Sequence, residues 1–290
     1  MKKNFLFLFV VLLTFRISAN VTLPKVFGDN MVLQRNKPIP VWGWADPNEK
    51  ISIRFNHQAK SITADKNGNW KVNLDNEIAG GPYQLIIKGN NTVTLKNVLV
   101  GEVWICSGQS NMEMPIEGWG KVTNYEREIA AANYPQIRHI KIPNTISSIP
   151  QKDIPQGEWK VCSPATAGDF TAAGYFFARE LYDQLKIPIG LINTSWGGTH
   201  VETWTSREAF EGSDEFKNMI AKMPMLNLDS IAKIRKEAIL KKIEGLQGPL
   251  PVADETASWK MADFDDSKWS QMGLPSLWEQ KQLGDLDGVV

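Results

Sequence analysis

The chain has 290 residues and a formal net charge of zero, with 32 basic and 32 acidic side chains. This length exceeds one typical domain. The balanced charge, with no cluster of Lys and Arg, argues against a protein that binds nucleic acid by electrostatic attraction. The one charge-dense stretch, residues 233–244, mixes both signs and predicts a solvated helix face.

The first 19 residues have the pattern of a secretory signal peptide. Lys2 and Lys3 precede an almost entirely apolar segment at residues 5–15, and the pattern ends at the small residue Ala19. The apolar segment is short for a membrane span, and an uncleaved anchor is the alternative. We therefore expect a secreted or periplasmic protein with no stable membrane insertion after cleavage.

Two cysteines are present, Cys106 and Cys162. Export would allow them to form a disulfide. Cys106 lies in a strand that is expected to be buried, so two separate buried thiols are the other possibility.

Residues 20–97 predict a small β-sandwich domain. Short apolar or alternating runs recur about every ten residues and are separated by turn signals. The runs are Met31–Leu33, Ile39–Trp44, Ile51–Phe55, Trp70–Leu74, Tyr83–Ile87 and Val93–Leu95. We expect Trp42, Trp44 and Trp70 to pack in the core of this domain, and stacking on sugar rings is the alternative.

A strand and a tight turn follow at residues 98–115. The apolar run Val98–Cys106 predicts a buried strand of a parallel sheet, and the small polar residues of Ser107–Asn111 predict a turn. A serine at the carboxyl edge of such a sheet lies where open α/β folds bind ligands, which makes Ser110 a candidate nucleophile. The next segment, Met112–Met114, begins a helix or remains a loop; a helix there would direct its N–H groups at an oxyanion.

The turn Gly108–Met112 reads GQSNM and follows a strand that ends in VWIC. It differs from the G-x-S-x-G nucleophile elbow at Met112. It resembles the first block of the sialate O-acetylesterase family, which belongs to the SGNH (GDSL-like) hydrolases. The resemblance implies a carbohydrate esterase with Ser110 as the nucleophile of an acyl-enzyme and with Gln109 and Asn111 in contact with the substrate.

The resemblance implies that residues 98–250 form the first part of a three-layer α/β/α hydrolase domain of SGNH type with a parallel sheet. The expected elements are helices near 125–132, 171–185 and 229–246, strands at 136–142 and 187–193, and an extended segment at 159–164. The succession of strand, helix and strand favours a right-handed parallel crossover. His139 alternates with apolar neighbours and is expected on the polar face of its strand rather than in the catalytic machinery.

A second block follows the strand that ends at Asn193. Gly197 and Gly198 let the backbone approach a ligand closely and direct N–H groups at it, as an oxyanion hole requires. The segment Trp196–Thr199, with Glu202 and Trp204 after it, resembles the second block of the same family. The resemblance implies that this loop supplies an oxyanion-hole glycine, either Gly197 or Gly198.

Residues 251–290 resemble the opening of a galactose-binding-like jelly roll that interrupts the hydrolase domain in many family members. The family's Asp-x-x-His pair follows that insertion and is absent from this sequence. Of the three histidines, only His200 is expected near Ser110, whereas His57 lies in the β domain and His139 in a strand. We therefore expect residues 1–290 alone to be a poor esterase, because a serine hydroxyl needs a base.

The expected substrate is an acetylated sugar, a sialic acid or another glycan. No metal or organic cofactor is expected, because acyl transfer needs only a nucleophile, a base and oxyanion donors, and no cluster has the spacing of metal ligands. An acetyl esterase for plant polysaccharides and a non-catalytic carbohydrate-binding product remain as alternatives. The sequence leaves the acetyl position and the oligomeric state open.

Overall fold

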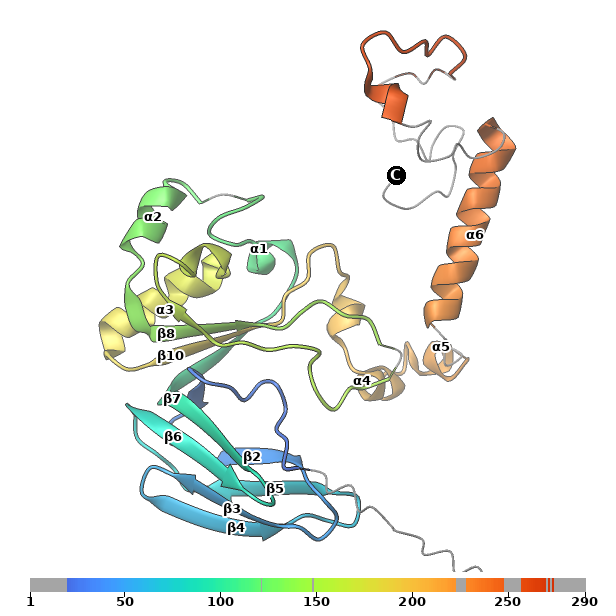
Figure 1. Ribbon diagram of the computed structural model, residues 1–290. Coiled ribbons are helices and arrows are strands. Elements are labelled where there is room, and N and C mark those ends of the chain that lie inside the picture. The colour runs from blue at the N-terminus through green and yellow to red at the C-terminus, as the bar shows by residue number, and fades with distance from the viewer. Residues whose placement is uncertain are drawn as a thin grey trace, which may run out of the picture. The chain divides into compact units, whose positions relative to one another are not determined.

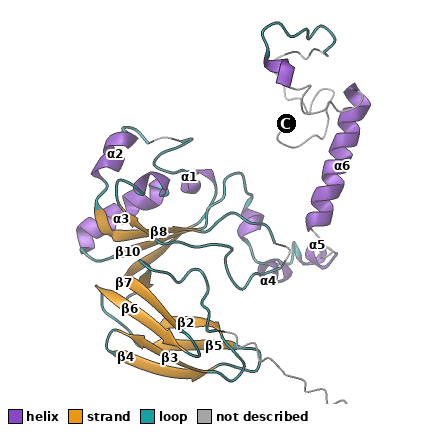
Figure 2. Cartoon of the chain, in the orientation of Figure 1, coloured by secondary structure: helices purple, strands orange, loops and turns teal. Residues whose placement is uncertain are grey.

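The computed structural model describes residues 20–120, 122–147, 149–222, 228–247, 257–269, 271 and 273 (Figures 1 and 2). The chain divides into two compact units, and the first comprises residues 1–146 and 150–220. The expected signal peptide, residues 1–19, lies outside the described residues, as does most of the expected insertion at 251–290. Within the described ranges, every helix is too short or too polar to cross a membrane.

The amino-terminal part of the first unit is built from antiparallel strands. β2 pairs with β5 in one sheet, while β4, β3, β6 and β7 form part of a larger one. Trp70 from the first sheet shares a core with Ile53 and Leu85 from the second, so the two sheets pack as a sandwich. The strands are β1 (Val32–Gln34), β2 (Ile39–Trp44), β3 (Lys50–Phe55), β4 (Gln58–Thr63), β5 (Asn69–Leu74), β6 (Gly80–Lys88) and β7 (Thr92–Cys106).

Each of the six apolar runs overlaps a strand, and the turn signals between them are confirmed. Asn30, Asn48 and Gly68 have positive φ angles of 67°, 62° and 81°, which Asn and Gly adopt more easily than other residues. Strand β4 was not predicted, because its sequence QAKSIT is mostly polar. It lies at the edge of its sheet, where polar side chains are tolerated and discourage further pairing.

Strand β7 is continuous through both parts of the first unit (Figure 1). From Thr92 to Val100 it pairs antiparallel with β6, and from Glu102 to Cys106 it pairs parallel with β10 (Ile189–Asn193). The boundary expected after residue 97 therefore falls inside one strand.

The second part of the first unit is a mixed sheet with parallel strands and flanking helices. Its order is β7-β10-β8-β9, where β8 (Tyr134–Lys141) runs parallel to β10 and β9 (Lys160–Cys162) runs antiparallel to β8. The predicted strand, helix and parallel strand are confirmed as β8, α3 (Ala172–Leu185) and β10. The other helices near this sheet are α1 (Ser110–Glu113), α2 (Tyr125–Ala131) and the 3₁₀ turn η1 (Ala167–Asp169).

The two faces of this sheet bury different residues. On the helical face, Phe170 and Tyr175 share a core with Ile137 of β8, and all three are fully buried. On the other face, Trp159 lies in the core that the sheet shares with the sandwich, and its indole N–H donates to the Val26 carbonyl at 2.8 Å. The sheet thus has an apolar layer on both sides, as parallel strands require.

The expectation that β7 is buried to its end is wrong for two residues. Trp104 and Ile105 are 43% and 69% exposed. Among the described residues, no strand pairs with β7 beyond Gly101 on the side away from β10, so this edge lies open. Trp104 packs instead edge-to-face on Phe177 of α3, with ring centroids 5.0 Å apart.

Both cysteines are buried free thiols in this structure. Burial raises the pKa of each thiol to about 11, so both are protonated at neutral pH.

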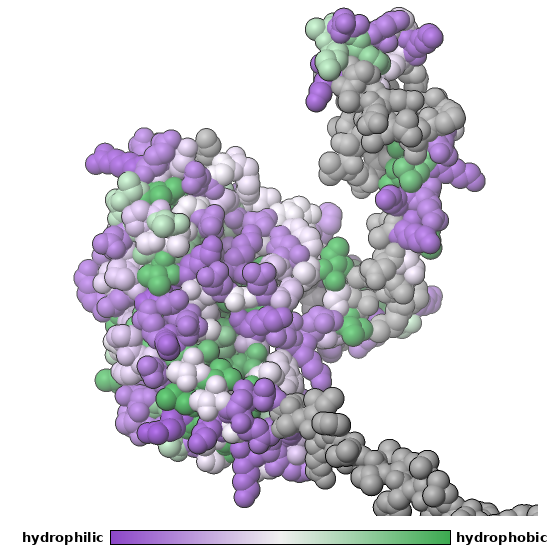
Figure 3. Space-filling view, in the orientation of Figure 1, coloured by the Kyte–Doolittle hydropathy of each residue, from purple (hydrophilic) through white to green (hydrophobic). Residues whose placement is uncertain are grey.

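The remaining described elements follow β10. They are the 3₁₀ turn η2 (Val201–Trp204), α4 (Arg207–Glu211), α5 (Lys217–Lys222), α6 (Leu228–Gln247) and the 3₁₀ turn η3 (Ala257–Lys260). Helix α6 confirms the helix expected at 229–246 and belongs to the second unit. Within that unit, Trp259 and Trp269 meet edge-to-face with centroids 5.3 Å apart. On the face of the molecule shown in Figure 3, hydrophilic side chains cover most of the first unit, with small apolar areas between them.

Substitution of Gly101 is expected to lower the stability of the protein strongly. A Cβ added at this position would lie 1.9 Å from the backbone oxygen of Pro188, so Gly101→Ala must displace one of two paired backbones. We expect a loss of roughly 1–3 kcal/mol in the free energy of unfolding, measured by urea denaturation. Gly245→Ala in α6 is the control, because its Cβ meets nothing within 4 Å. Equal stability of Gly101→Ala and the parent chain would contradict the observed backbone approach.

Candidate active site

The two sequence blocks meet at the carboxyl ends of neighbouring strands. Gly108, with a φ of 138°, turns the chain after β7 so that Ser110 begins α1. Beyond the ladder of β7 and β10, the Thr194 N–H donates to the Cys106 carbonyl and the Trp196 N–H donates to the Gly108 carbonyl, both at 2.9 Å. These bonds extend the pairing of the two strands into their loops and bring the second block to the serine.

Gly197 is the residue of the second block that lies against Ser110. A Cβ added to Gly197 would be 3.3 Å from the Ser110 hydroxyl oxygen. The Gly197 N–H already donates to the Glu113 carboxylate at 2.5 Å. Gly198 has a φ of 73°, and its N–H has no acceptor among the described residues. Of the two glycines, Gly198 is therefore the one whose N–H is available to another acceptor.

Helix α1 is a single turn held in place by the start of α3. The Thr171 hydroxyl donates to the Met112 carbonyl at 2.6 Å, and the Ala172 N–H donates to the Met114 carbonyl at 2.8 Å. Met112 and Glu113 thus lie in this helical turn, and Met114 follows it. A helix of four residues has only a weak dipole, so individual N–H groups matter more here than a helix field.

The second block is stabilised by its own side chains. The Thr199 hydroxyl donates to the Trp196 carbonyl at 2.7 Å, and the Trp204 indole N–H donates to the Thr199 hydroxyl oxygen at 3.0 Å. The loop therefore keeps its shape through hydrogen bonds that need Thr and Trp at these two positions. Gln109 and Asn111, which flank the serine, are both exposed and accessible to a ligand.

Glu113 is a site residue that sequence analysis missed. Its carboxylate accepts hydrogen bonds from Gly197 at 2.5 Å, from the Lys141 ammonium at 2.9 Å and from the Asn144 amide at 3.1 Å. Burial would raise the pKa of this carboxyl, but the bonds from Lys141 and Gly197 outweigh burial and lower the pKa. Glu113 thus joins α1, β8 and the glycine loop as an ionised group.

No histidine is hydrogen-bonded to Ser110 within the described ranges. His200 is exposed at the start of η2, and His57 lies 3.9 Å from Glu77 in the sandwich. The expectation that His139 lies on a polar face is wrong. It is only 2% exposed and stacks on Phe170 with centroids 4.5 Å apart, because the residues before α3 cover this face of β8.

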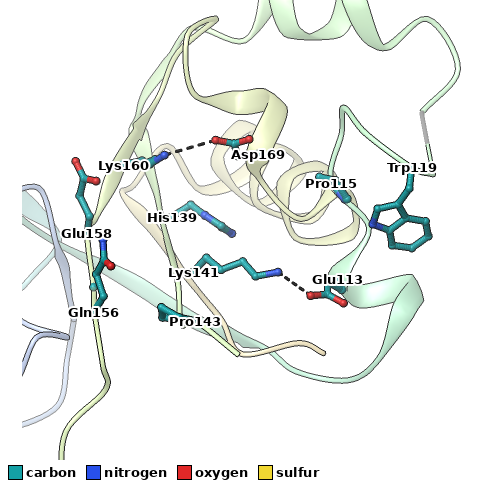
Figure 4. A pocket seen from close by; sticks show the side chains of 11 residues that line it. Glu113, Pro115, Trp119, His139, Lys141, Pro143, Gln156, Glu158, Lys160 and Asp169 are labelled. Carbon is teal, nitrogen blue, oxygen red and sulfur yellow. Dashed lines mark hydrogen bonds and ion pairs between the residues drawn. The ribbon is translucent and has the colours of Figure 1, made fainter. Parts of the chain in front are cut away.

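A pocket of about 480 Å³ lies beside this region at the end of β8 (Figure 4). The ammonium of Lys141 pairs with Glu113, and that of Lys160 pairs with Asp169 at 3.5 Å. Trp119 lies across the pocket from the lysines and is 67% exposed. The charged and aromatic side chains that line the pocket are Glu113, Trp119, His139, Lys141, Glu158, Lys160 and Asp169.

The buried His139 side chain is expected to make the free energy of unfolding depend on pH. Burial, together with the charges of Lys141 and Lys160, lowers its pKa to about 3, whereas the unfolded chain has a value near 6.5. Between these values the unfolded chain binds a proton that the folded chain does not, so stability falls as pH falls below about 6.5.

In this window, we expect protonation of His139 in the unfolded chain to lower the free energy of unfolding by up to about 1.4 kcal/mol for each unit by which the pH falls. Since His139→Phe removes this group, its urea unfolding curve should lose less stability than the parent between about pH 6 and pH 4. Equal pH slopes for the two proteins would show that His139 titrates normally.

Residues 100–240 match the family model described as carbohydrate esterase, sialic acid-specific acetylesterase. These residues make up slightly less than half of the chain. Sialate O-acetylesterase from Mus musculus is 29% identical over 226 residues, which cover 70% of this chain and 41% of the mouse protein. The enzyme of the same name from Homo sapiens is 29% identical and covers 73% of this chain and 43% of the human protein.

A solved structure is also similar to this chain. A carbohydrate acetylesterase from Xanthomonas citri is 43% identical, with a TM-score of 0.64 over 66% of this chain and 44% of that chain. This chain therefore spans less than half the length of the esterase family members it matches. The residues that the family model matches, 100–240, include the turn with Ser110 and the loop with Gly197.

Proposed function

We propose that this protein removes O-acetyl groups from sugars, sialic acids foremost, with Ser110 as the nucleophile. The observation that carries the proposal is the approach of the Gly197 loop to the Ser110 hydroxyl, at the carboxyl edge of a sheet with parallel strands. The family match over residues 100–240 supports an acetylated sugar as the substrate.

In the proposed reaction, the Ser110 oxygen attacks the acetyl carbonyl carbon while a base takes the hydroxyl proton. The sugar oxygen leaves with a proton, and an acetyl group remains on Ser110. Water then attacks this acyl-enzyme, which releases acetate and restores the serine. The N–H of Gly198 has no other acceptor among the described residues and is our candidate donor to the oxyanion.

The base is not assigned to a residue of the described chain. His139 is unsuitable as the base because Phe170 covers its ring. Among the described residues, His200 has no hydrogen bond that would orient its ring toward Ser110. A base without such an orienting partner would be inefficient.

The proposal is tested by following acetate release from 9-O-acetylated sialic acid and from an acetylated xylose oligomer. We expect slow release from the sialic acid derivative, because no base is assigned within the described chain, together with labelling of Ser110 by a fluorophosphonate, located by mass spectrometry. Labelling of another serine would refute the proposed nucleophile. Release from the xylose oligomer but not from the sialic acid derivative would identify plant polysaccharides, and not sialic acids, as the substrate class.

We also propose that the protein is exported, on the basis of the basic and apolar pattern of residues 1–19. Amino-terminal sequencing of protein recovered from outside the cytoplasm should give a start near Asn20. Recovery only of the uncleaved chain from the cytoplasm would refute this proposal.

A further inference from the structure

His139 carries a buried nitrogen atom that forms no hydrogen bond within the described part of the chain. The residue is 2% exposed, and its Nε2 is the unpaired atom. Stacking on Phe170, at an angle of 19° between the rings, fixes how the imidazole is presented. Buried polar atoms generally have a partner in the protein, in solvent or in a ligand. Because His139 lies at the wall of the pocket (Figure 4), a hydroxyl group bound there would satisfy it.

The charges of the pocket disfavour an anionic ligand. Both ammonium groups are already paired, Lys141 with Glu113 at 2.9 Å and Lys160 with Asp169 at 3.5 Å. Glu158 adds a third carboxylate to the lining. A ligand carboxylate would have to displace one of these pairs, whereas a hydroxyl can donate to a carboxylate or accept from an ammonium without separating them.

The size and the aromatic wall of the pocket suit a sugar. Its volume of about 480 Å³ is in the range of small-molecule sites. Trp119, which is 67% exposed, offers a flat apolar surface on which the C–H face of a sugar ring can pack. Apolar packing on one side and hydroxyl-binding groups on the other match the two faces of a sugar ring.

The pocket is connected to the Ser110 region through Glu113. One carboxylate oxygen of Glu113 pairs with Lys141 at the pocket, and the other accepts the Gly197 N–H beside Ser110. Lys141 also ends β8 at the same carboxyl edge of the sheet at which Ser110 follows β7. A ligand in the pocket would therefore lie next to the proposed acyl-transfer centre.

We propose that this pocket binds an uncharged, polyhydroxylated part of the sugar substrate, with His139 Nε2 hydrogen-bonded to one of its hydroxyl groups. The inference rests on the proposed function, since it gives the substrate of that site a place to bind. Two sources share this chemistry: a neutral sugar ring, or the glycerol side chain of a sialic acid. His139 is thus a residue that determines specificity, not the catalytic base.

The test measures sugar binding without turnover. In the Ser110→Ala background, an acetylated xylose oligomer and 9-O-acetylated sialic acid are titrated by calorimetry into proteins with His, Phe or Gln at position 139. Phe keeps an aromatic ring on Phe170 but cannot form the hydrogen bond, whereas Gln keeps a polar group. We expect His139→Phe to weaken one of the two ligands about tenfold, as loss of one hydrogen bond would, and His139→Gln to recover part of this loss.

The ligand that is weakened identifies the source of the hydroxyl groups. His57→Phe, which changes an exposed histidine of the sandwich, is the control and should leave both affinities unchanged. Equal affinities of the His and Phe proteins would overturn the inference, as would failure of both ligands to bind the protein with His139. Binding that falls steeply with salt and does not depend on His139 would show an anionic ligand and would also overturn it.

The same ligands, tested for acetate release with Ser110 intact, separate this inference from the proposed function. Sugar binding that depends on His139 without any acetate release would support the pocket and refute the esterase. Acetate release with a KM that His139→Phe leaves unchanged would refute the pocket alone.

Discussion

Ser110→Ala is expected to lower kcat for ester hydrolysis by a factor on the order of 10⁶, if the residue is the nucleophile. The reason is that this change removes the oxygen that attacks the acetyl carbonyl and carries the acyl group. Ser110 begins α1, and its hydroxyl lies next to Gly197, so the Ala variant should keep both the helix and the loop. The measurement is acetate release from an aryl acetate and from an acetylated sugar by an active form of the protein.

Ser107→Ala provides the matched control for this prediction. Ser107 is an exposed residue of the same turn, three positions before Ser110, and we assign it no role in the reaction. Its activity should stay close to that of the parent protein. If Ser110→Ala retained activity while Ser107→Ala lost it, the nucleophile would have been placed at the wrong serine.

Gly197→Val is expected to reduce kcat by roughly 10²- to 10³-fold, because moving this loop would take the Gly198 N–H, our candidate donor, away from the oxyanion. The first added carbon would already lie 3.3 Å from the Ser110 hydroxyl oxygen and 3.0 Å from the Glu113 carboxylate. The branched methyl groups would then push the loop away or cover the serine. The two nearest atoms belong to the side chains of Ser110 and Glu113, which can move. We therefore expect the variant to fold, as measured by circular dichroism, while its turnover falls.

Gly198→Asn is the companion variant. Its Cβ would meet nothing within 4 Å, and Asn accepts the positive φ of 73° better than other side chains. It keeps the backbone N–H and should lose much less activity than Gly197→Val. A larger loss in Gly198→Asn would mean that open space at this loop is needed for the substrate itself.

The order of elements could be predicted because each has a strong local pattern. The alternation in Ile39–Trp44 and the helical spacing of apolar residues in Ala172–Leu185 both appear as expected. Strand β4 was missed because an edge strand needs few apolar residues. The continuity of β7 was missed because Lys96 and Asn97 separate the apolar runs Val93–Leu95 and Val98–Cys106. The strand continues through both, although Asn97 has a positive φ.

The site was predictable only where chain order and strand direction determine it. Ser110 and Gly197 each follow a strand, and parallel neighbours bring such positions together. Glu113 and His139 could not be assigned, because their roles depend on contacts with residues from other elements. Glu113 meets the Gly197 loop, 84 positions away, and His139 is covered by Phe170, which precedes another helix. The GQSNM segment contains no local signal for either contact.

The continuity of β7 makes the sandwich and the hydrolase sheet parts of one cooperative structure. Its first half has hydrogen bonds to β6 and its second half to β10, so neither sheet can lose this strand without weakening the other. Heat or denaturant should therefore melt both together, and amide hydrogen exchange should be slow along the whole strand. A substitution that destabilises the sandwich core should then also increase how often the end of β7, next to the Ser110 turn, opens. The amino-terminal sandwich thus serves as an anchor that sets the rigidity of the proposed nucleophile.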